Sequence, residues 1–249
     1  MKILLANPNT SGFITDRMLR VAQAAVGSAA TIVGVTAPHG PAVVGSRTEN
    51  TLAASAALEL GAAHAEGCDA MLLGISTDAG LEPLRELLDI PVVGMLEAAL
   101  LTACQLGGRI GLLTLGERML PLYQEQARRM GMAGRMAGWA GIELPAAFAP
   151  QSGDAPEPAV AEAVAEHAVR LVQDQCLDAL VLSGAVLAGY RPAVQPRLPV
   201  PVIDGIEAAA WQAVALGAQK PAAHRAGSYA PPRGRRVTGT GAPLARRLA

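Results

Sequence analysis

Polar side chains that can bind or polarise a small molecule follow several of the apolar runs of this chain. These polar turns begin at Asn7, Ser76, Thr114 and Ser183. Amides and hydroxyls in such turns donate hydrogen bonds, and the N-terminus of the helix that follows attracts negative charge. We therefore expect a site for a small molecule that carries carbonyl or carboxylate oxygen atoms.

The predicted site residues fall into two groups. The predicted substrate-binding residues are Asn7, Asn9, Thr10, Ser11, Thr114, Gly184 and Ala185, and the predicted catalytic residues are Asp78, Ser76, Thr77 and Ser183. Asp78 is the predicted base among them, because serine and threonine need a partner that activates them. Two structural interpretations stay open, since the NPNTS segment also suits a turn with a helix cap, and Asp78 before Gly80 also suits a cap.

Residues 69–104 and 178–214 are two imperfect copies of one segment. Asp69-AMLLGISTDAG aligns with Asp178-ALVLSGAVLAG at an offset of 109 residues, and Pro91-VVGMLEAALLTACQLGG aligns with Pro201-VIDGIEAAAWQAVALGA at an offset of 110. A repeat of this length is typical of a duplicated α/β lobe and is too long for a solenoid unit. Two such lobes would form a small-molecule cleft where their matching strand ends meet.

Short apolar runs alternate with longer helical patterns, which predicts parallel βαβ units. Strands are expected at residues 2–6, 31–36, 70–74, 91–94, 109–114, 136–142, 179–183 and 200–203. Helices are expected at residues 11–25, 47–66, 82–88, 97–106, 118–130, 158–175 and 205–216, and a surface loop at 146–156. The predicted fold class is α/β, with two pseudo-symmetric lobes, each a roughly four-stranded parallel sheet flanked by helices, and a ligand cleft between them.

The expected domains follow from this pattern. Residues 1–98 form the first α/β lobe, which the helix at 205–217 completes, and residues 99–204 form the second lobe. Residues 218–249 are rich in Pro, Gly, Arg and Ala without a clear period. We expect them to form an extended C-terminal tail that packs on the body or on a partner subunit.

Composition restricts the class of protein. The 249 residues are 51% hydrophobic and carry a formal net charge of −1, which argues against nucleic acid as a partner. No uncharged apolar run reaches the roughly 18 residues of a membrane span, so we expect a cytoplasmic protein without membrane contact. The three cysteines and four histidines are scattered, which predicts neither a metal site nor disulfides. A homo-oligomer is expected, as for most proteins of this kind.

Several motifs together, in their order and spacing, resemble the aspartate/glutamate/hydantoin racemase superfamily, specifically its hydantoin/allantoin racemase branch. They are ILLANPNTS at the start, DAGL at 78–81, PVVGMLEAAL at 91–100, IGLLT at 110–114, LVLSGA at 180–185, PVIDGIEAAA at 201–210 and GSYAPP at 227–232. The resemblance implies an isomerase without a cofactor and with a ligand between two lobes. It implies proton transfer at a carbon next to a carbonyl, in a small carboxylate, amino acid or hydantoin-type substrate.

The resemblance also implies two cysteines, one per lobe, on opposite faces of the substrate carbon, where one thiolate removes a proton and the other thiol returns one. This chain has Ile75 and Gly184 at those positions, and the two residues match each other in the internal repeat. Neither side chain ionises, so a two-thiol mechanism is not possible at this site.

Three kinds of function therefore stay open. The first is an enzyme of this superfamily that uses Asp78 as its single base, for isomerisation or for decarboxylase or lyase chemistry. The second is a non-catalytic paralogue that only binds the ligand. The third is a structural paralogue that assembles with another subunit through residues 219–249.

Overall fold

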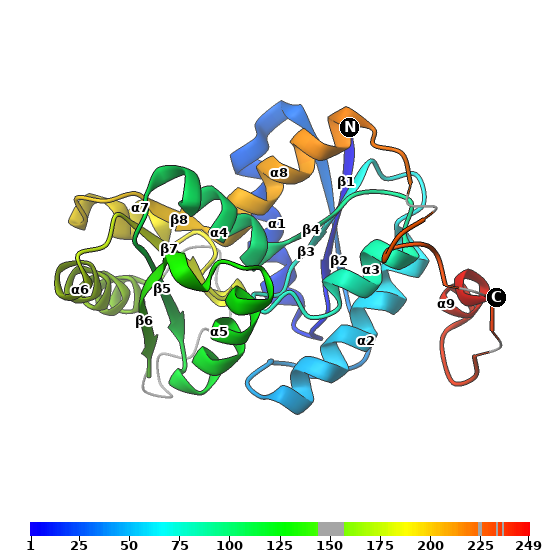
Figure 1. Cartoon of the computed structure of the whole chain (residues 1–249), viewed down its shortest axis with the longest axis horizontal. Coiled ribbons are helices and arrows are strands. Elements are labelled where there is room, and N and C mark those ends of the chain that lie inside the picture. The colour runs from blue at the N-terminus through cyan, green and yellow to red at the C-terminus, as the bar shows by residue number, and fades with distance from the viewer. Residues whose placement is uncertain (144–156, 224–225, 233, 236) are drawn as a thin grey trace.

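Two parallel four-stranded sheets form the two lobes of the molecule (Figure 1). The computed structural model describes residues 1–143, 157–223, 226–232, 234–235 and 237–249. The strand order is β2-β1-β3-β4 in the first sheet and β6-β5-β7-β8 in the second. Strands that correspond in the two halves of the chain thus occupy the same place in each sheet. The predicted α/β fold with two pseudo-symmetric lobes is confirmed.

The strands lie within two residues of the predicted ranges. Those of the first sheet are β1 (Lys2–Asn7), β2 (Thr31–Thr36), β3 (Ala70–Leu73) and β4 (Val92–Gly94). Those of the second sheet are β5 (Ile110–Leu115), β6 (Met136–Ile142), β7 (Ala179–Ser183) and β8 (Val202–Asp204). The strands β3 and β7 are buried along their whole length, as expected of apolar runs in a parallel sheet covered on both faces.

The helices that the periodicity predicts are present, and two more are found. The predicted ones are α1 (Gly12–Val26), α2 (Arg47–His64), α3 (Leu81–Leu87), α4 (Met95–Leu106), α5 (Leu120–Arg129), α6 (Pro158–Gln175) and α8 (Gly205–Gln219). The additional ones are α7 (Arg191–Val194) and α9 (Ala242–Leu248). The loop expected at 146–156 lies outside the described residues. In the described ranges, no helix is both long and apolar enough to cross a membrane.

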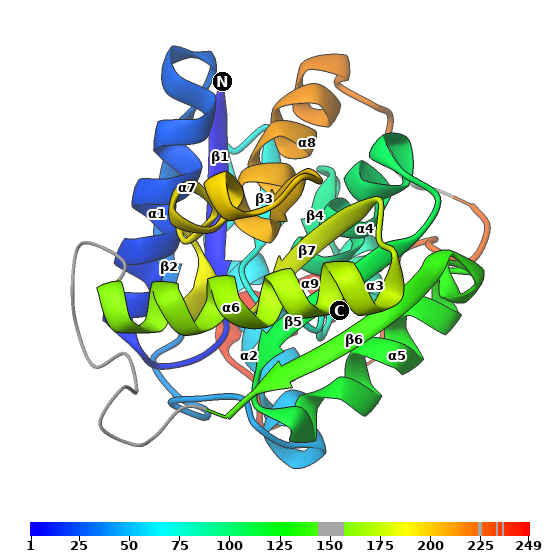
Figure 2. The same ribbon diagram turned by 90° about the vertical axis from the view of Figure 1, so that its left-hand side faces the viewer.

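Apolar side chains form a central core between the sheets and one outer core on each lobe. Alternate residues of a strand point to opposite faces, so Ile3 and Leu5 of β1 join the central core while Leu4 and Ala6 join the outer core under α2. Helix α6 covers the outer face of the second sheet (Figure 2). The central core contains residues of both lobes and fixes one sheet relative to the other.

Helices α4 and α8 are exchanged between the lobes. Helix α4 follows β4 of the first sheet but packs on β7 of the second, and α8 follows β8 but packs on β3 of the first. The two helices also pack on each other between the sheets, where Gln212 Nε2 donates to the carbonyl oxygen of Ala98 at 2.9 Å (Figure 1). Helix α8 thus packs on the first sheet, and the predicted domains, including the assignment of residues 205–217 to the first lobe, stay a prediction.

The C-terminal tail is not extended throughout, which corrects the sequence-based expectation. It ends in the helix α9, whose first turn contains Pro243, a residue that suits the start of a helix. Leu244 of α9 is buried in the outer core of the first lobe, and the backbone N–H of Gly241 donates to Glu59 Oε1 of α2 at 2.8 Å. This short helix escaped prediction because its single apolar turn has no sustained period.

Candidate active site

A cavity of about 310 Å³ lies between the two lobes, at the carboxyl ends of the central strands β1, β3, β5 and β7. Its walls are formed by Asn9, Ser11, Phe13, Ile14, Ala42, Val43, Val44, Gly74, Ile75, Ser76, Thr114, Leu115, Met119, Tyr123, Gly184, Ala185 and Val186. Ligands of open α/β sheets bind at this end of the strands. Seven of the residues singled out from the sequence lie here, namely Asn9, Ser11, Ile75, Ser76, Thr114, Gly184 and Ala185.

Asn7 organises the first turn of the cavity but does not line it. Its fully buried amide donates to Asn9 Oδ1, to the carbonyl oxygen of Ser11 and to Thr15 Oγ1 at 3.0, 3.2 and 2.9 Å. The backbone N–H of Thr10 donates to the carbonyl oxygen of Pro41, and Thr10 does not line the cavity either. The side-chain amide of Asn7 and the backbone N–H of Thr10 are thus bonded within the protein, and the ligand-binding role of these two residues stays a prediction.

Asp78, the predicted base, lies outside the cavity. Its two carboxylate oxygens accept hydrogen bonds from the backbone N–H groups of Leu96 and Glu97, at 2.9 and 2.7 Å, in the first turn of α4. Burial raises the pKa of Asp78 to about 7, against the lowering effect of these two hydrogen bonds. The carboxylate caps α4 and does not line the cavity, so the role of Asp78 as base stays a prediction that its position does not support.

Thr77 and Ser183 also differ from their predicted catalytic role. Thr77 Oγ1 donates to Asn50 Oδ1 at 2.5 Å, and the residue borders a different, polar cavity. Ser183 ends β7 next to Thr114 of β5 and is only 2% exposed. Of the two neighbouring strand ends, Thr114 lines the cavity between the lobes and Ser183 does not.

Tyr123 is the site residue that the sequence reasoning missed. It lies on α5 and is 2% exposed, and its hydroxyl is 2.7 Å from Ser76 Oγ. Thr114 Oγ1 donates to the same hydroxyl at 3.4 Å. Tyr123 therefore joins the turn after β3 of the first lobe to the end of β5 in the second. The sequence did contain a signal for this residue. Tyr123 is one of only three tyrosines in the chain and follows the polar strand end at Thr114 by nine residues.

Ile75 and Gly184 both border the cavity, one from each lobe. Ile75 is packed in the outer core of the first lobe, and Gly184 has a φ of +132°, a backbone conformation that favours glycine. No cysteine is among the described residues that line the cavity. Burial raises the pKa of the Cys68 thiol, which lies in the outer core of the first lobe.

Arg17 is a buried cation that links the two lobes next to the cavity. Its guanidinium donates from Nη1 to the carbonyl oxygen of Val186 at 2.8 Å and lies 5.8 Å from the centre of the Tyr190 ring. Arg17 belongs to α1 of the first lobe, whereas Val186 belongs to the turn after β7 that lines the cavity. This contact holds one wall of the cavity against the other lobe.

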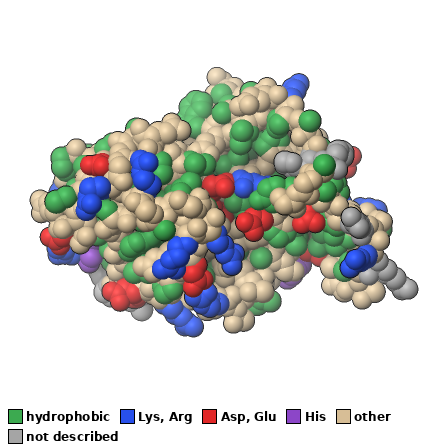
Figure 3. All heavy atoms as spheres, viewed as in Figure 1, with side chains coloured by type: hydrophobic (Ala, Val, Ile, Leu, Met, Phe, Trp, Pro, Cys, Tyr) green, Lys and Arg blue, Asp and Glu red, His purple; other side chains and the backbone are tan. Residues whose placement is uncertain are grey.

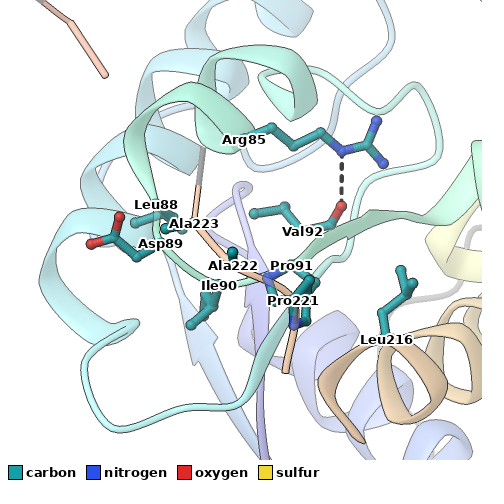
Figure 4. Close-up of a pocket in the computed structure, with 10 residues that line it drawn as sticks. All are labelled: Arg85, Leu88, Asp89, Ile90, Pro91, Val92, Leu216, Pro221, Ala222 and Ala223. Atoms are coloured by element: carbon teal, nitrogen blue, oxygen red, sulfur yellow. Dashed lines mark hydrogen bonds between the residues drawn. The ribbon is translucent and has the colours of Figure 1, made fainter. Parts of the chain in front are cut away.

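A second pocket lies far from these strand ends, beside the first residue of β4 (Figure 4). Apolar residues of the segment between α3 and β4, of α8 and of the start of the tail form most of its wall, and Arg85 Nε of α3 donates to the carbonyl oxygen of Val92 at 3.0 Å. Arg85 also pairs with Glu97. This pocket is not at a carboxyl end of a strand, so it is not the candidate active site. In the described ranges, no cluster of three or more His, Cys, Asp or Glu is arranged to hold a metal ion.

The family of the chain follows from comparison with known proteins. The sequence profile described as Asp/Glu/Hydantoin racemase matches residues 3–213, which include both sheets and every wall of the cavity. This chain belongs to that racemase family.

Relatives within the family lie in the hydantoin and allantoin racemase branch. The hydantoin racemase of Paenarthrobacter aurescens is 31% identical over 237 residues, which cover 93% of this chain and 98% of the relative. The hydantoin racemase of Pseudomonas sp. (strain NS671) is 30% identical over 209 residues, which cover 84% of this chain and 82% of the relative. These matches identify the chain as an enzyme of the isomerase class.

Solved structures agree with the fold. The allantoin racemase of Pseudomonas fluorescens superposes with a TM-score of 0.89 at 30% identity, over 96% of this chain and 100% of that chain. The allantoin racemase of Klebsiella pneumoniae gives the same TM-score at 28% identity, over 96% of both chains. Arylmalonate decarboxylase, at 18% identity and a TM-score of 0.63 over 87% of this chain and 92% of that chain, shares the fold.

Proposed function

We propose that this racemase-family enzyme works without a cofactor and transfers a proton at a carbon next to a carbonyl of a small hydantoin-type ring. The polarity of the cavity supports this substrate class. Its described walls carry the hydroxyls of Ser11, Ser76, Thr114 and Tyr123 and the amide of Asn9, and no lysine, arginine, aspartate or glutamate. An uncharged ring of amide groups can exchange hydrogen bonds with these side chains, whereas a bare carboxylate or ammonium would lose water without a counter-charge.

The names of the relatives support the same class. The curated relatives named above are hydantoin racemases, and the structures with the highest quoted similarity are allantoin racemases. The likeness covers the turns that line the cavity as well as the sheets. A hydantoin-type ring is therefore favoured over the amino acids and simple carboxylates that the sequence left open.

The proposed chemistry uses one acid–base side chain in place of two thiols. Ile75 and Gly184 occupy the positions at which the family resemblance implies thiols, and neither can carry a proton. Tyr123 can, because its phenol hydroxyl can lose and regain a proton, and this hydroxyl lies within hydrogen-bonding distance of Ser76 Oγ and Thr114 Oγ1. The same phenol then returns a proton to the carbon from the side on which it lies. This proposal rests above all on the position of the Tyr123 hydroxyl between the two lobes.

A single acid–base group on one face of the ring carbon predicts different rates for proton exchange and for inversion. The proton at the ring carbon should exchange with solvent faster than the carbon inverts, since no second ionisable side chain lines the described part of the cavity wall. We would follow one enantiomer of a 5-substituted hydantoin in D₂O by proton NMR and polarimetry. The proposal predicts loss of the proton signal ahead of loss of optical rotation.

Tyr123→Phe is the decisive variant, and Tyr229→Phe, which removes a phenol outside the cavity, is its control. Positioned acid–base groups contribute about 10²–10⁴-fold, so Tyr123→Phe should lower the exchange rate by at least about 100-fold. Undiminished exchange in Tyr123→Phe would rule out the phenol as the acid–base group.

A second candidate function is ligand binding without turnover. The observation that favours it is the scarcity of acid–base groups at the site. In the described cavity wall, Tyr123 is the one side chain with an ionisable proton, whereas the two-thiol chemistry that the family resemblance implies needs two. Hydantoin-induced chemical-shift changes in the wild-type protein without any exchange at the ring carbon would support this candidate. Exchange that depends on Tyr123 would exclude it.

A further inference from the structure

A third cavity, polar and about 150 Å³ in volume, lies between α2 of the first lobe and α5 of the second, where basic and acidic side chains gather on the surface (Figure 3). Its walls carry the guanidinium groups of Arg47 and Arg129, the amides of Asn50 and Gln126 and the carboxylate of Glu125. The main cavity has hydroxyl and apolar walls instead. The two cavities therefore suit different chemical groups.

Residues 76–77 and 122–123 lie between the two cavities and form a partition. Ser76 and Tyr123 line the main cavity, and their chain neighbours Thr77 and Leu122 line the polar cavity. The 2.7 Å contact between the hydroxyls of Ser76 and Tyr123 joins the two halves of this partition. Rotation of the Ser76 side chain toward a ligand would break that contact and leave the Tyr123 hydroxyl the hydrogen bond from Thr114 Oγ1. A substituent on a ring in the main cavity has to pass this partition to reach the polar cavity.

The charge of the polar cavity indicates what it binds. Arg47 makes two hydrogen bonds to Glu125, at 2.7 and 2.5 Å, and this pair links α2 to α5. Arg129 adds a second guanidinium, so the charged side chains of the wall carry two positive charges and one negative charge. The Arg47 guanidinium lowers the pKa of Glu125, which therefore stays ionised. The excess positive charge favours an anionic group, and the planar guanidinium fork matches a carboxylate.

We propose that the polar cavity is the subsite for a carboxylate at the end of the substrate's side chain, while the uncharged hydantoin-type ring occupies the main cavity. This inference rests on the proposed function and narrows its substrate class. Arg129 and Arg47 bind the carboxylate from opposite lobes. Glu125 competes with the ligand for Arg47 and sets an upper limit on its affinity.

Two hydantoins of equal size test the subsite: 5-(2-carboxyethyl)hydantoin and its uncharged analogue, 5-(2-carbamoylethyl)hydantoin. Calorimetric titration of the wild-type protein should give a dissociation constant about tenfold lower for the carboxylate, the size of one charge-assisted hydrogen bond. Arg129→Gln should remove this preference and leave binding of the carbamoyl compound unchanged. Arg128→Gln is the matched control, because Arg128 is the exposed neighbour on α5 that does not line the polar cavity.

Glu125→Gln should change affinity in the opposite direction. Removal of the competing carboxylate releases Arg47 and should strengthen binding of the carboxyethyl compound several-fold, with no change for the carbamoyl compound. Equal binding of the two compounds by the wild-type protein would overturn the subsite, and so would equal effects of Arg129→Gln and Arg128→Gln. If neither compound binds, the hydantoin-type substrate class fails as well, so the two failures are distinguishable.

Discussion

Asp78 and Asp204 cap the corresponding helices of the two lobes from different places in the chain. Asp204 directly precedes α8 and accepts from the N–H groups of Ile206 and Glu207 at 2.8 and 3.3 Å. Asp78 lies in the turn after β3 and accepts from the equivalent N–H groups of α4. The position that corresponds to Asp204 is Gly94, where an added Cβ would lie 2.6 Å from Asp78 Cγ. One carboxylate thus occupies the same place in each lobe.

A carboxylate at position 94 should replace the helix cap of α4 that is lost when Asp78 is substituted. Asp78→Ala leaves two backbone N–H groups without their acceptor and should lower the free energy of unfolding by about 1–3 kcal/mol. Gly94 has φ −81° and ψ 144°, close to the −85° and 126° of Asp204, so its backbone suits an aspartate. The end of the Leu81 side chain, 2.7 Å from the added Cβ, has to shift. Asp78→Ala combined with Gly94→Asp should regain part of the loss in urea unfolding. A double variant no more stable than Asp78→Ala would contradict this equivalence.

Stability should depend on pH through the same two carboxylates. Burial raises the pKa of Asp78 from 3.8 to about 7 and that of Asp204 to about 6. In this range the unfolded chain has released the proton and the folded chain retains it, so the free energy of unfolding falls as pH rises. Relative to Asp78→Asn, the wild-type protein should lose stability between pH 3.8 and about 7 and then level off. Parallel pH profiles for the two proteins would count against this titration.

Two thiols placed in the cavity should introduce racemisation. Ile75 and Gly184 line it from different lobes, and a Cβ at Gly184 would have no neighbour closer than Thr114 Oγ1 at 3.7 Å. Polarimetry of Ile75→Cys/Gly184→Cys with a chiral hydantoin should show racemisation about 100-fold faster than either single variant. The control is Ile75→Ser/Gly184→Ser, which matches the size without a thiolate. The positive φ at Gly184 should reduce the stability of both pairs equally.

Arg17 should matter for stability and for substrate affinity together. Arg17→Met leaves the Val186 carbonyl without its buried donor and should lower the free energy of unfolding by about 1–3 kcal/mol. Because Val186 lines the cavity, KM should rise more than kcat falls. Asp16→Asn, at an exposed position on the same helix, should change the free energy of unfolding by about 0.5 kcal/mol or less. Equal effects of the two substitutions would exclude a specific role of Arg17.

The helix at the end of the tail should contribute to the stability of the first lobe. Leu244 is 4% exposed against α2, so Leu244→Ala should lower the free energy of unfolding by about 2–3 kcal/mol. Val237→Ala, at a 40% exposed position of the same tail, is the control and should have little effect. Thermal unfolding of both variants measures the difference. Identical melting temperatures would show that α9 does not anchor the tail.

The sequence predicted the sheets well because their signals are local. Apolar runs, polar turns and the internal repeat located all eight strands of the described chain and the end of the sheets at which the cavity lies. The position of Asp78 as the cap of α4 was not foreseen because its partners, Leu96 and Glu97, lie 18 and 19 residues away, and periodicity does not encode such contacts. Tyr123 was missed for a related reason, since its role depends on how α5 packs against the other lobe. The homo-oligomer stays a prediction.

The exchange of α4 and α8 between the sheets has a consequence for how the protein is made. When residue 106 leaves the ribosome, all four strands of the first sheet exist, but the helix just completed, α4, packs on a sheet that has not yet been synthesised. The helix that covers the first sheet, α8, ends at Gln219 and emerges nearly last. Translation must therefore be almost complete before either half reaches its final packing, and the nascent N-terminal half exposes an unfinished apolar face until then.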